Sequence, residues 1–215
     1  NDPEISAAAA KKGVEIHDVR KNNEKDVSNR QNLREDCLRI HTVGQDCSVG
    51  KMLASVELAL ALKKRGHDAK FIATGQTGIM IEGWGIAVDA VVADFIAGAA
   101  ERITVEGARD ADIVLVEGQG SINHPGYSGV TLGLLHGSCP DGLILCHQSS
   151  REYIGDYRQS RWLRIPPLSA YVRWYEEIAS AVHPTRVVGV SLNTYDLDDA
   201  ALGRELAKRM DHDNV

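Results

Sequence analysis

At 215 residues, 43% of them hydrophobic, the chain is long enough to bury the core of one α/β domain with a small appendage. Its formal net charge of −6 and its pI of about 5.7 argue against a nucleic-acid partner. No apolar run approaches the roughly 18 residues that span a bilayer, and no signal peptide is visible, so we expect a cytoplasmic protein without a membrane partner. Its cysteines lack C-x-x-C spacing, which favours reduced thiols over a zinc site or a disulfide framework.

The first residues predict a helix and a strand that cannot fold alone. Asn1 to Glu4 is typical of a helix start, Ser6 to Lys12 is alanine-rich, and Gly13 is placed to end the helix. Val14 to His17 then predicts a short strand. One αβ unit cannot bury its own faces, so we interpret it as the tail of a preceding domain; the alternative is a decoration packed on the main sheet. The predicted division is tail 1–20, polar linker 21–36 and main domain 37–215.

A phosphate-binding loop is predicted between a strand over Cys37 to Val43 and a helix over Met52 to Arg65. In such a loop, backbone N–H groups and a helix N-terminus converge on an anion, and a lysine adds positive charge. The loop departs from the pattern G-x-x-x-x-G-K-[ST], because the first glycine is Gly44 where the pattern requires one at Gln45. Met52 also replaces the hydroxyl residue that would bind Mg²⁺. The predicted phosphate-binding residues are Gly44, Gln45, Asp46, Cys47, Ser48, Val49, Gly50, Lys51 and Met52.

This run resembles the loop of a bacterial P-loop family long catalogued as of unknown function, one branch of which is D-glutamate N-acetyltransferase. It is more distantly similar to the G-T-D-x-x-V-G-K-T loop of dethiobiotin synthetase and its amidoligase relatives, and Met52 favours the first family. The resemblance covers roughly residues 37 to 200. It implies a Rossmann-like domain before the P-loop domain, which agrees with the interpretation of residues 1–20.

A second strand, Ala69 to Ala73, leads into Thr74 to Gly78, a run very similar to one in the family. Small and polar residues at a strand's C-terminal edge are where open α/β sheets bind ligands, which makes Gln76, Thr77 and Gly78 candidates for substrate contact. The alternative is a glycine-rich turn needed only for its geometry. Ala87 to Arg102 predicts an apolar helix, whose Asp89 and Asp94 face either the site or solvent.

The third strand, Ile113 to Val116, ends in Glu117. A carboxylate at the end of an apolar strand beside a phosphate loop is the Walker B arrangement, which holds Mg²⁺ or orients a nucleophile. The loop after it contributes Ser121 and Asn123 as candidates for substrate contact, and His124 as a candidate general base. The alternatives are structural: Glu117 as an acid that caps the following turn, and His124 as a hydrogen-bonding residue of the surface or the core.

Two further strands, Gly142 to Cys146 and Val187 to Ser191, complete the pattern. His147 and Arg151 follow the first and are placed to meet an anionic ligand, the alternative being that Arg151 is only exposed to solvent. Asn193 follows the second, and in dethiobiotin synthetase-like relatives an asparagine here touches the nucleotide base; the alternative is a polar strand end. The predicted helices between and after these strands run from Ser128 to Gly137, Leu168 to Val182 and Asp198 to Met210. A polar stretch, Gly155 to Arg164, precedes the second of them. The apolar and aromatic residues of that helix, Tyr171 and Tyr175 among them, are interpreted as core or a subunit contact.

Alternating strands and helices, with polar clusters following the strands, predict a three-layer αβα sandwich with a mainly parallel sheet and one site at its C-terminal edge. The resemblance implies N-acetylation of D-glutamate or a similar amino acid by acetyl-CoA. From their places in the chain we take Lys51, Glu117 and His124 as candidate catalytic residues, and we expect a homo-oligomer. The alternatives are an ATP-dependent carboxylate–amine ligase, with Mg²⁺ on Glu117, and a nucleotide-binding module without turnover.

Overall fold

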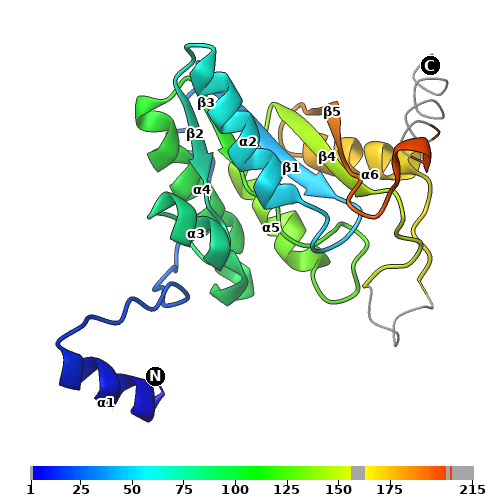
Figure 1. The fold of residues 1–215 in the computed structure, drawn as a ribbon. Helices are drawn as coiled ribbons and strands as arrows, with labels where there is room; N and C mark the ends of the chain where they lie inside the picture. The colour runs from blue at the N-terminus through cyan, green and yellow to red at the C-terminus, as the bar shows by residue number, and fades with distance from the viewer. Residues whose placement is uncertain (1, 156–162, 202–203, 205–215) are drawn as a thin grey trace.

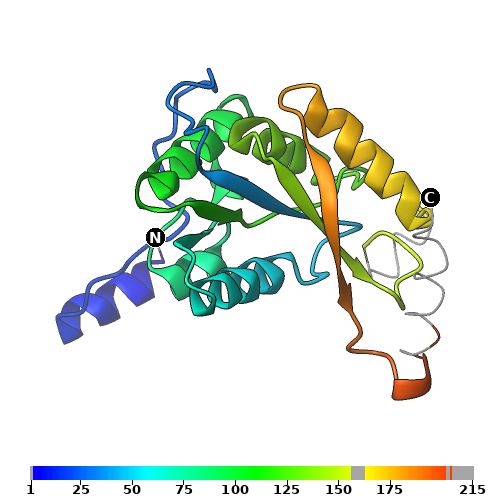
Figure 2. The same cartoon turned by 90° about the horizontal axis from the view of Figure 1, so that it is seen from above.

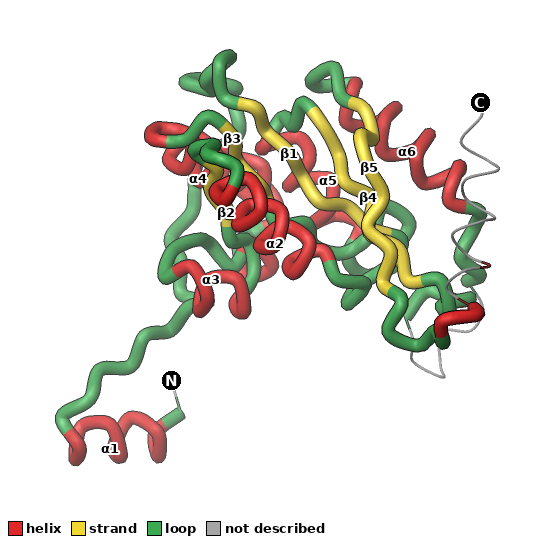
Figure 3. Tube along the Cα trace, turned by 45° about the horizontal axis from the view of Figure 1, so that its top comes forward, coloured by secondary structure: helices red, strands yellow, loops and turns green. Residues whose placement is uncertain are grey.

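The computed structural model describes residues 2–155, 163–201 and 204. Five parallel strands form one sheet in the order β2-β3-β1-β4-β5 (Figures 1 and 3). Each predicted strand of the main domain is present to within two residues at either end. The strands are β1 (Leu38–Gly44), β2 (Ala69–Ile72), β3 (Ile113–Val116), β4 (Gly142–Gln148) and β5 (Arg186–Asn193).

Helices cover both faces of the sheet, as Figure 2 shows. The alternation of side chains along the strands decides which helix each residue meets. Phe71 and Leu115 belong to the core cluster shared with α2, whereas Ile72, Val114 and Val116 belong to the cluster shared with α4. The fold is therefore the predicted α/β three-layer sandwich. Its helices are α1 (Pro3–Lys12), α2 (Lys51–Lys64), α3 (Gln76–Glu82), α4 (Ile96–Gly107), α5 (Ser128–Ser138) and α6 (Leu168–Ser180).

The predicted helix over residues 87–102 is wrong in its first half. Two short 3₁₀ turns, η1 (Val88–Ala90) and η2 (Ala93–Phe95), precede α4. Val88 and Val91 are buried in the same core cluster as α4. Hence the apolar run reflects a buried connection folded over the sheet, which apolar composition alone does not distinguish from a helix.

The helix predicted near the N-terminus is confirmed as α1, with Asp2 as its N-cap and Gly13 as its C-cap. The strand predicted at Val14 to His17 is wrong. Val14 is 59% exposed, and α1 with its following residues stands apart from the sheet (Figure 1). None of the strands in the described part of the chain lies alongside to supply a hydrogen-bonding ladder.

Residues 21–36 form no helix or strand, but part of the segment is fixed against α4. The buried carboxylate of Glu101 accepts hydrogen bonds from the backbone N–H groups of residues 29, 30 and 31 and from the Ser28 hydroxyl. Gly98 permits the close approach, because a Cβ there would overlap the carbonyl oxygen of Asp26. The division into tail, linker and main domain stays a prediction.

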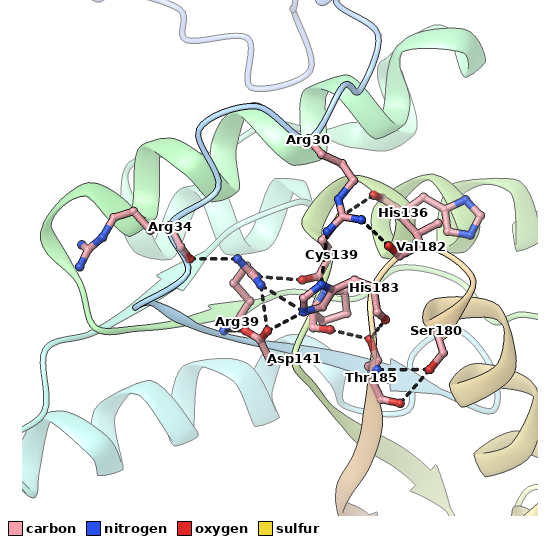
Figure 4. A network of polar contacts seen from close by, with 11 residues as sticks. Arg30, Arg34, Arg39, His136, Cys139, Asp141, Ser180, Val182, His183 and Thr185 are labelled. Atoms are coloured by element: carbon pink, nitrogen blue, oxygen red, sulfur yellow. Dashed lines mark hydrogen bonds and ion pairs between the residues drawn. The ribbon is translucent and has the colours of Figure 1, made fainter.

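A polar network closes the N-terminal edge of the sheet, opposite the predicted site (Figure 4). The Arg39 guanidinium is buried, and it donates to Asp141 Oδ1 at 2.8 Å and to the carbonyl oxygen of Cys139 at 2.8 Å. Nε2 of His183 lies 2.7 Å from the same Asp141 oxygen. The side-chain nitrogens of Arg39 and Nε2 of His183 all have partners in this cluster, which indicates a structural role, although the buried Nε2 of His136 has none among the described residues.

Two predictions fall wholly or largely on residues that are not described. The polar stretch predicted over residues 155–164 lies mostly outside the described residues, and so does most of the helix predicted over 198–210. At the start of the latter, Asp198 Oδ1 accepts a hydrogen bond from the backbone N–H of Ala201, which is the geometry of a helix N-cap.

Candidate functional site

The polar residues after the strands gather at one edge, because all five strands are parallel. β1 pairs with β3 on one side and with β4 on the other. The loop after β1 is therefore flanked by Glu117, which follows β3, and by His147 at the end of β4. This adjacency is what the sequence pattern predicted for a site at the carboxyl ends of the strands.

The loop between β1 and α2 has the geometry of an anion-binding turn. Ser48 and Gly50 adopt positive φ angles of 56° and 104°, and Gly50 is the N-cap of α2 without a capping side chain. The backbone N–H groups at the start of α2 are thus available to an anion. Gly44 is required by crowding, since a Cβ there would lie 2.8 Å from Cγ2 of Val49. This explains a glycine one position earlier than the standard pattern.

Lys51 is buried inside the loop that it is predicted to serve. Its Nζ donates to the carbonyl oxygen of Asp46 at 2.6 Å. Burial lowers the pKa of Lys51, while the nearby Cys47, Cys146 and Asp46 act in the opposite direction. An anionic ligand in the loop would supply a negative charge to balance the buried ammonium group of Lys51.

Asp46 is the most heavily contacted residue of the loop. Its fully buried carboxylate accepts from Arg151 Nη1 at 2.8 Å, from the Gly155 backbone N–H at 2.7 Å and from the Cys47 backbone N–H at 2.7 Å. Arg151, predicted to meet an anionic ligand, binds this carboxylate and also donates to the carbonyl oxygen of Cys47 at 2.7 Å, while its role toward a ligand stays a prediction. Both its contacts therefore brace the loop.

His124 lies beside Asp46 and Cys47, and the three side chains place candidate metal-ligand atoms within 4.8 Å of one another. Nδ1 of His124 accepts a hydrogen bond from the backbone N–H of Gly126 at 3.0 Å, so the proton of the neutral ring is on Nε2. Nε2 lies 3.9 Å from Asp46 Oδ1. In this conformation His124 offers an N–H donor to the site, whereas a base or a metal ligand needs a lone pair there.

Glu117 is buried behind the first turn of α3. Its Oε2 accepts the backbone N–H groups of Thr74 at 2.8 Å and Gly75 at 3.0 Å. Gly78 packs directly against it, because a Cβ on Gly78 would lie 2.5 Å from Oε2. Burial raises the pKa of Glu117, although these two N–H groups and Lys51 oppose the rise. The absence of side chains at Gly75 and Gly78 thus leaves room for the Glu117 carboxylate.

The remaining predicted contact residues lie around this centre at varying depth. Gln76 and Thr77 are exposed in the first turn of α3. Ser121 is buried and donates to Asn123 Oδ1 at 2.9 Å. Asn193 is half-buried, and its Oδ1 accepts the backbone N–H of Tyr195 at 3.1 Å. Their predicted roles toward a ligand stay predictions.

Gln45 turns its side chain inward. The residue is fully buried, and its Nε2 donates to the carbonyl oxygen of Gln148 at 3.0 Å, while Oε1 has no partner among the described residues. Gln45 thereby ties the loop to the end of β4, and its role toward a ligand stays a prediction.

Sequence reasoning missed two residues of the site, Tyr171 and Tyr175 of α6. The sequence places them among the apolar and aromatic residues of a predicted helix, which favours core or a subunit contact. Both are fully buried, as predicted for core, but their hydroxyl groups donate to the carbonyl oxygens of Gln45 and Gly44. The available signal was the choice of tyrosine, since a buried hydroxyl requires a partner.

An open cavity of about 580 Å³ lies beside the loop, next to Arg151. Its lining combines cationic groups with apolar side chains, which suits a ligand that has both an anionic and an apolar part. The residues that line it are His147, Arg151, Glu152, Arg164, Ile165, Pro166, Pro167 and Leu168.

The phosphate-loop geometry agrees with a match to a known protein family. Residues 25–213 match the family model described as a domain of unknown function, the DUF1611_C P-loop domain. The chain belongs to this DUF1611 family. No helix among the described residues is long and apolar enough to cross a membrane.

Relatives of this DUF1611 chain include a D-glutamate N-acetyltransferase of Pseudoalteromonas sp, 42% identical over 173 residues, which are 80% of this chain and 51% of the relative. A protein of the same name from Tritonibacter scottomollicae is 38% identical over 214 residues, 93% of this chain and 59% of the relative. A crystal structure of a DUF1611 family protein from Anabaena variabilis superposes with a TM-score of 0.86 at 41% identity, over 97% of this chain and 60% of that one. The chain thus spans little more than half the length of the curated relatives it matches.

Proposed function

We propose that this chain is the phosphate-binding part of an enzyme that transfers the acetyl group of acetyl-CoA to the amino group of D-glutamate or a similar amino acid. The observation that carries the proposal is a phosphate loop with a poor set of Mg²⁺ ligands. Met52 replaces the metal-binding hydroxyl. Oε2 of Glu117 already accepts hydrogen bonds from two backbone N–H groups. The Asp46 carboxylate already accepts hydrogen bonds from Arg151 and from two other backbone N–H groups. Such a loop suits a cosubstrate that keeps its phosphates.

In this proposal the loop N–H groups and Lys51 bind the pyrophosphate or the 3′-phosphate of CoA. The pantetheine arm then carries the thioester away from Lys51, and the cavity beside Arg151 has the size and mixed lining to receive it. Arg164 lines the same cavity and has no hydrogen bond or ion pair from its guanidinium to the described residues, which leaves it available to a carboxylate of the acceptor.

The chemical step requires that a neutral amine attacks the thioester carbonyl and that a base removes the amine proton. Of the predicted acid–base residues, Glu117 has a raised pKa, which makes its carboxylate a stronger base than an ordinary one. His124 presents Nε2–H, which suits it to donate to an oxyanion or a phosphate oxygen. The names of the curated relatives support this reaction class.

One observation keeps the ATP-dependent ligase as a second candidate. β3 pairs directly with β1, so Glu117 lies next to the phosphate loop, as an acid does where it takes part in phosphoryl transfer. An ATP-dependent ligase would require the Glu117 carboxylate to give up its hydrogen bonds to the backbone and to bind Mg²⁺. It predicts tight binding of ATP that depends on the metal.

Calorimetric titration with acetyl-CoA, and separately with Mg-ATP, discriminates the two candidates. We expect acetyl-CoA to bind and Lys51→Ala to abolish the binding, while Lys63→Ala, which removes a lysine at the far end of α2, leaves it unchanged. Mass spectrometry should then detect N-acetyl-D-glutamate when D-glutamate is added. Metal-dependent ATP binding without acetyl-CoA binding would reject acetyl transfer in favour of the ligase.

A further inference from the structure

Four consecutive carbonyl groups of the phosphate loop, those of residues 44 to 47, each accept a hydrogen bond from a side chain. Lys51 and Arg151 supply the donors for residues 46 and 47. Tyr175 donates to the Gly44 carbonyl at 2.7 Å, and Tyr171 donates to the Gln45 carbonyl at 3.0 Å. The two tyrosines come from α6 and lie 126 and 131 residues along the chain from the carbonyls that they bind.

The direction of these carbonyls matters to an anion. A carbonyl oxygen that turned toward a bound phosphate would repel it, whereas the N–H groups of the same loop attract it. The tyrosines draw the carbonyls of Gly44 and Gln45 toward α6. On the other side, the backbone N–H of Gln45 donates to the carbonyl oxygen of Cys146 at 3.3 Å, which extends the β1–β4 ladder. The entry of the loop is thereby held between α6 and β4.

Tyr175 also connects the loop to the segment after β3. Its hydroxyl oxygen accepts the backbone N–H of Ile122 at 3.0 Å while its proton goes to Gly44. Ile122 lies two residues before His124, so the same hydroxyl fixes two parts of the site relative to each other. The phenol is protonated at physiological pH, and hence a donor; burial raises the pKa of Tyr175 further, to about 12.

We propose that Tyr171 and Tyr175 are positioning residues of the phosphate site, which hold the carbonyls of Gly44 and Gln45 away from the ligand so that the loop N–H groups converge on it. The inference rests on the phosphate site of the proposed function and not on acetyl transfer. Leu168, which lines the cavity, lies three residues before Tyr171 on the same helix, so α6 contacts both the cavity and the loop.

The test uses Tyr171→Phe, Tyr175→Phe and the double variant, titrated with acetyl-CoA and with inorganic pyrophosphate as a minimal anionic probe. Each single change should raise Kd about tenfold, since it leaves one buried carbonyl without its donor. Tyr175→Phe should have the larger effect, because it also removes the acceptor of the Ile122 N–H. In steady-state kinetics, KM for acetyl-CoA should rise while KM for the amino acid stays unchanged.

Thr104→Val is the matched control. Thr104 is buried in α4, and its hydroxyl donates to the carbonyl oxygen of Ala100 at 2.7 Å, so the change removes the same kind of hydrogen bond far from the loop. It should lower the midpoint of thermal unfolding and leave Kd unchanged. Wild-type Kd in both tyrosine variants, or Kd changes that match those of Thr104→Val, would overturn the proposal.

The two ligands separate this inference from the proposed function. If the wild type binds pyrophosphate but not acetyl-CoA, acetyl transfer fails while the tyrosine variants still test the positioning role with pyrophosphate. If the wild type binds neither ligand, the phosphate site fails and the positioning role fails with it.

Discussion

The carboxylate of Asp46 and the guanidinium of Arg151 form a buried ion pair, with Nη1 2.8 Å from Oδ2, across 105 residues of sequence. The Asp46 side chain is fully buried and that of Arg151 is 11% exposed. Because the pair joins the phosphate loop to the segment after β4, the geometry of the loop depends on a distant part of the chain.

Arg151→Gln should therefore destabilise the protein by about 3 kcal/mol, because it leaves a buried carboxylate without its cation. Urea unfolding measures this change. Arg20→Gln is the control: Arg20 pairs with Asp89 on the surface, both are more than 40% exposed, and the loss should stay below about 1 kcal/mol. Adding Asp46→Asn to Arg151→Gln should recover part of the stability. If the stability loss of the double variant equals the sum of the losses of the two single variants, the two charges do not interact.

Close packing of Gly78 against Glu117 gives the second prediction. Gly78→Ala places a Cβ 2.5 Å from Oε2 of Glu117 and 3.1 Å from Cζ of Phe71, so it should destabilise the protein by about 1–3 kcal/mol and shift the carboxylate. Gly129→Ala is the matched control, since its Cβ meets open space in α5, and alanine favours a helix by about 0.5–1 kcal/mol over glycine. Thermal unfolding of both variants checks the contrast. Equal stability of the two would contradict the packing argument.

The sequence suffices to predict which strands form the sheet and which loops meet at its edge, because buried parallel strands read as short apolar runs and their carboxyl ends coincide. It does not reveal the partner of Arg151, since pairing at long range depends on tertiary contacts that spacing does not encode. Nor does the helical period distinguish a tyrosine that only fills the core from Tyr171 or Tyr175, which also binds a loop carbonyl. For the same reason the sequence does not reveal that Gly78 packs against Glu117. A glycine permits another group to approach the backbone closely, but only the fold shows which group does so.

Glu117 provides a prediction about pH. Its pKa is raised in the folded state, mainly by burial, so the folded protein holds this proton more tightly than the unfolded chain does. The corresponding stabilisation is fully present below the usual glutamate pKa of about 4.5 and is lost as pH rises through the folded-state value. Glu117→Gln removes the titration, so the stability of the wild type relative to this variant should fall as pH increases from 4.5. Parallel stability curves for the two proteins would show that the pKa of Glu117 is not raised.

His41 gives a prediction of the opposite sign: its contribution to stability should fall as the pH is lowered. The residue lies in β1 beneath the phosphate loop, 1% exposed, with Nδ1 2.9 Å from the Ser138 hydroxyl oxygen. Burial, and secondarily the Lys51 ammonium, lowers the pKa of His41 to about 3. The unfolded chain takes up this proton near pH 6.5 and the folded protein does not, so stability is present above pH 6.5 and falls as the pH drops toward 3.

Between pH 7 and pH 5 this single group should account for a loss of about 2 kcal/mol in the free energy of unfolding. His41→Gln retains a hydrogen-bonding side chain toward Ser138 but does not titrate, so its loss over the same interval should be smaller by that amount. His67→Gln, at an exposed position, should lose as much as the wild type. Urea unfolding at the two pH values measures all three proteins. If His41→Gln loses as much stability as the wild type between the two pH values, then His41 is not held neutral beneath the loop, and burial does not lower its pKa as described.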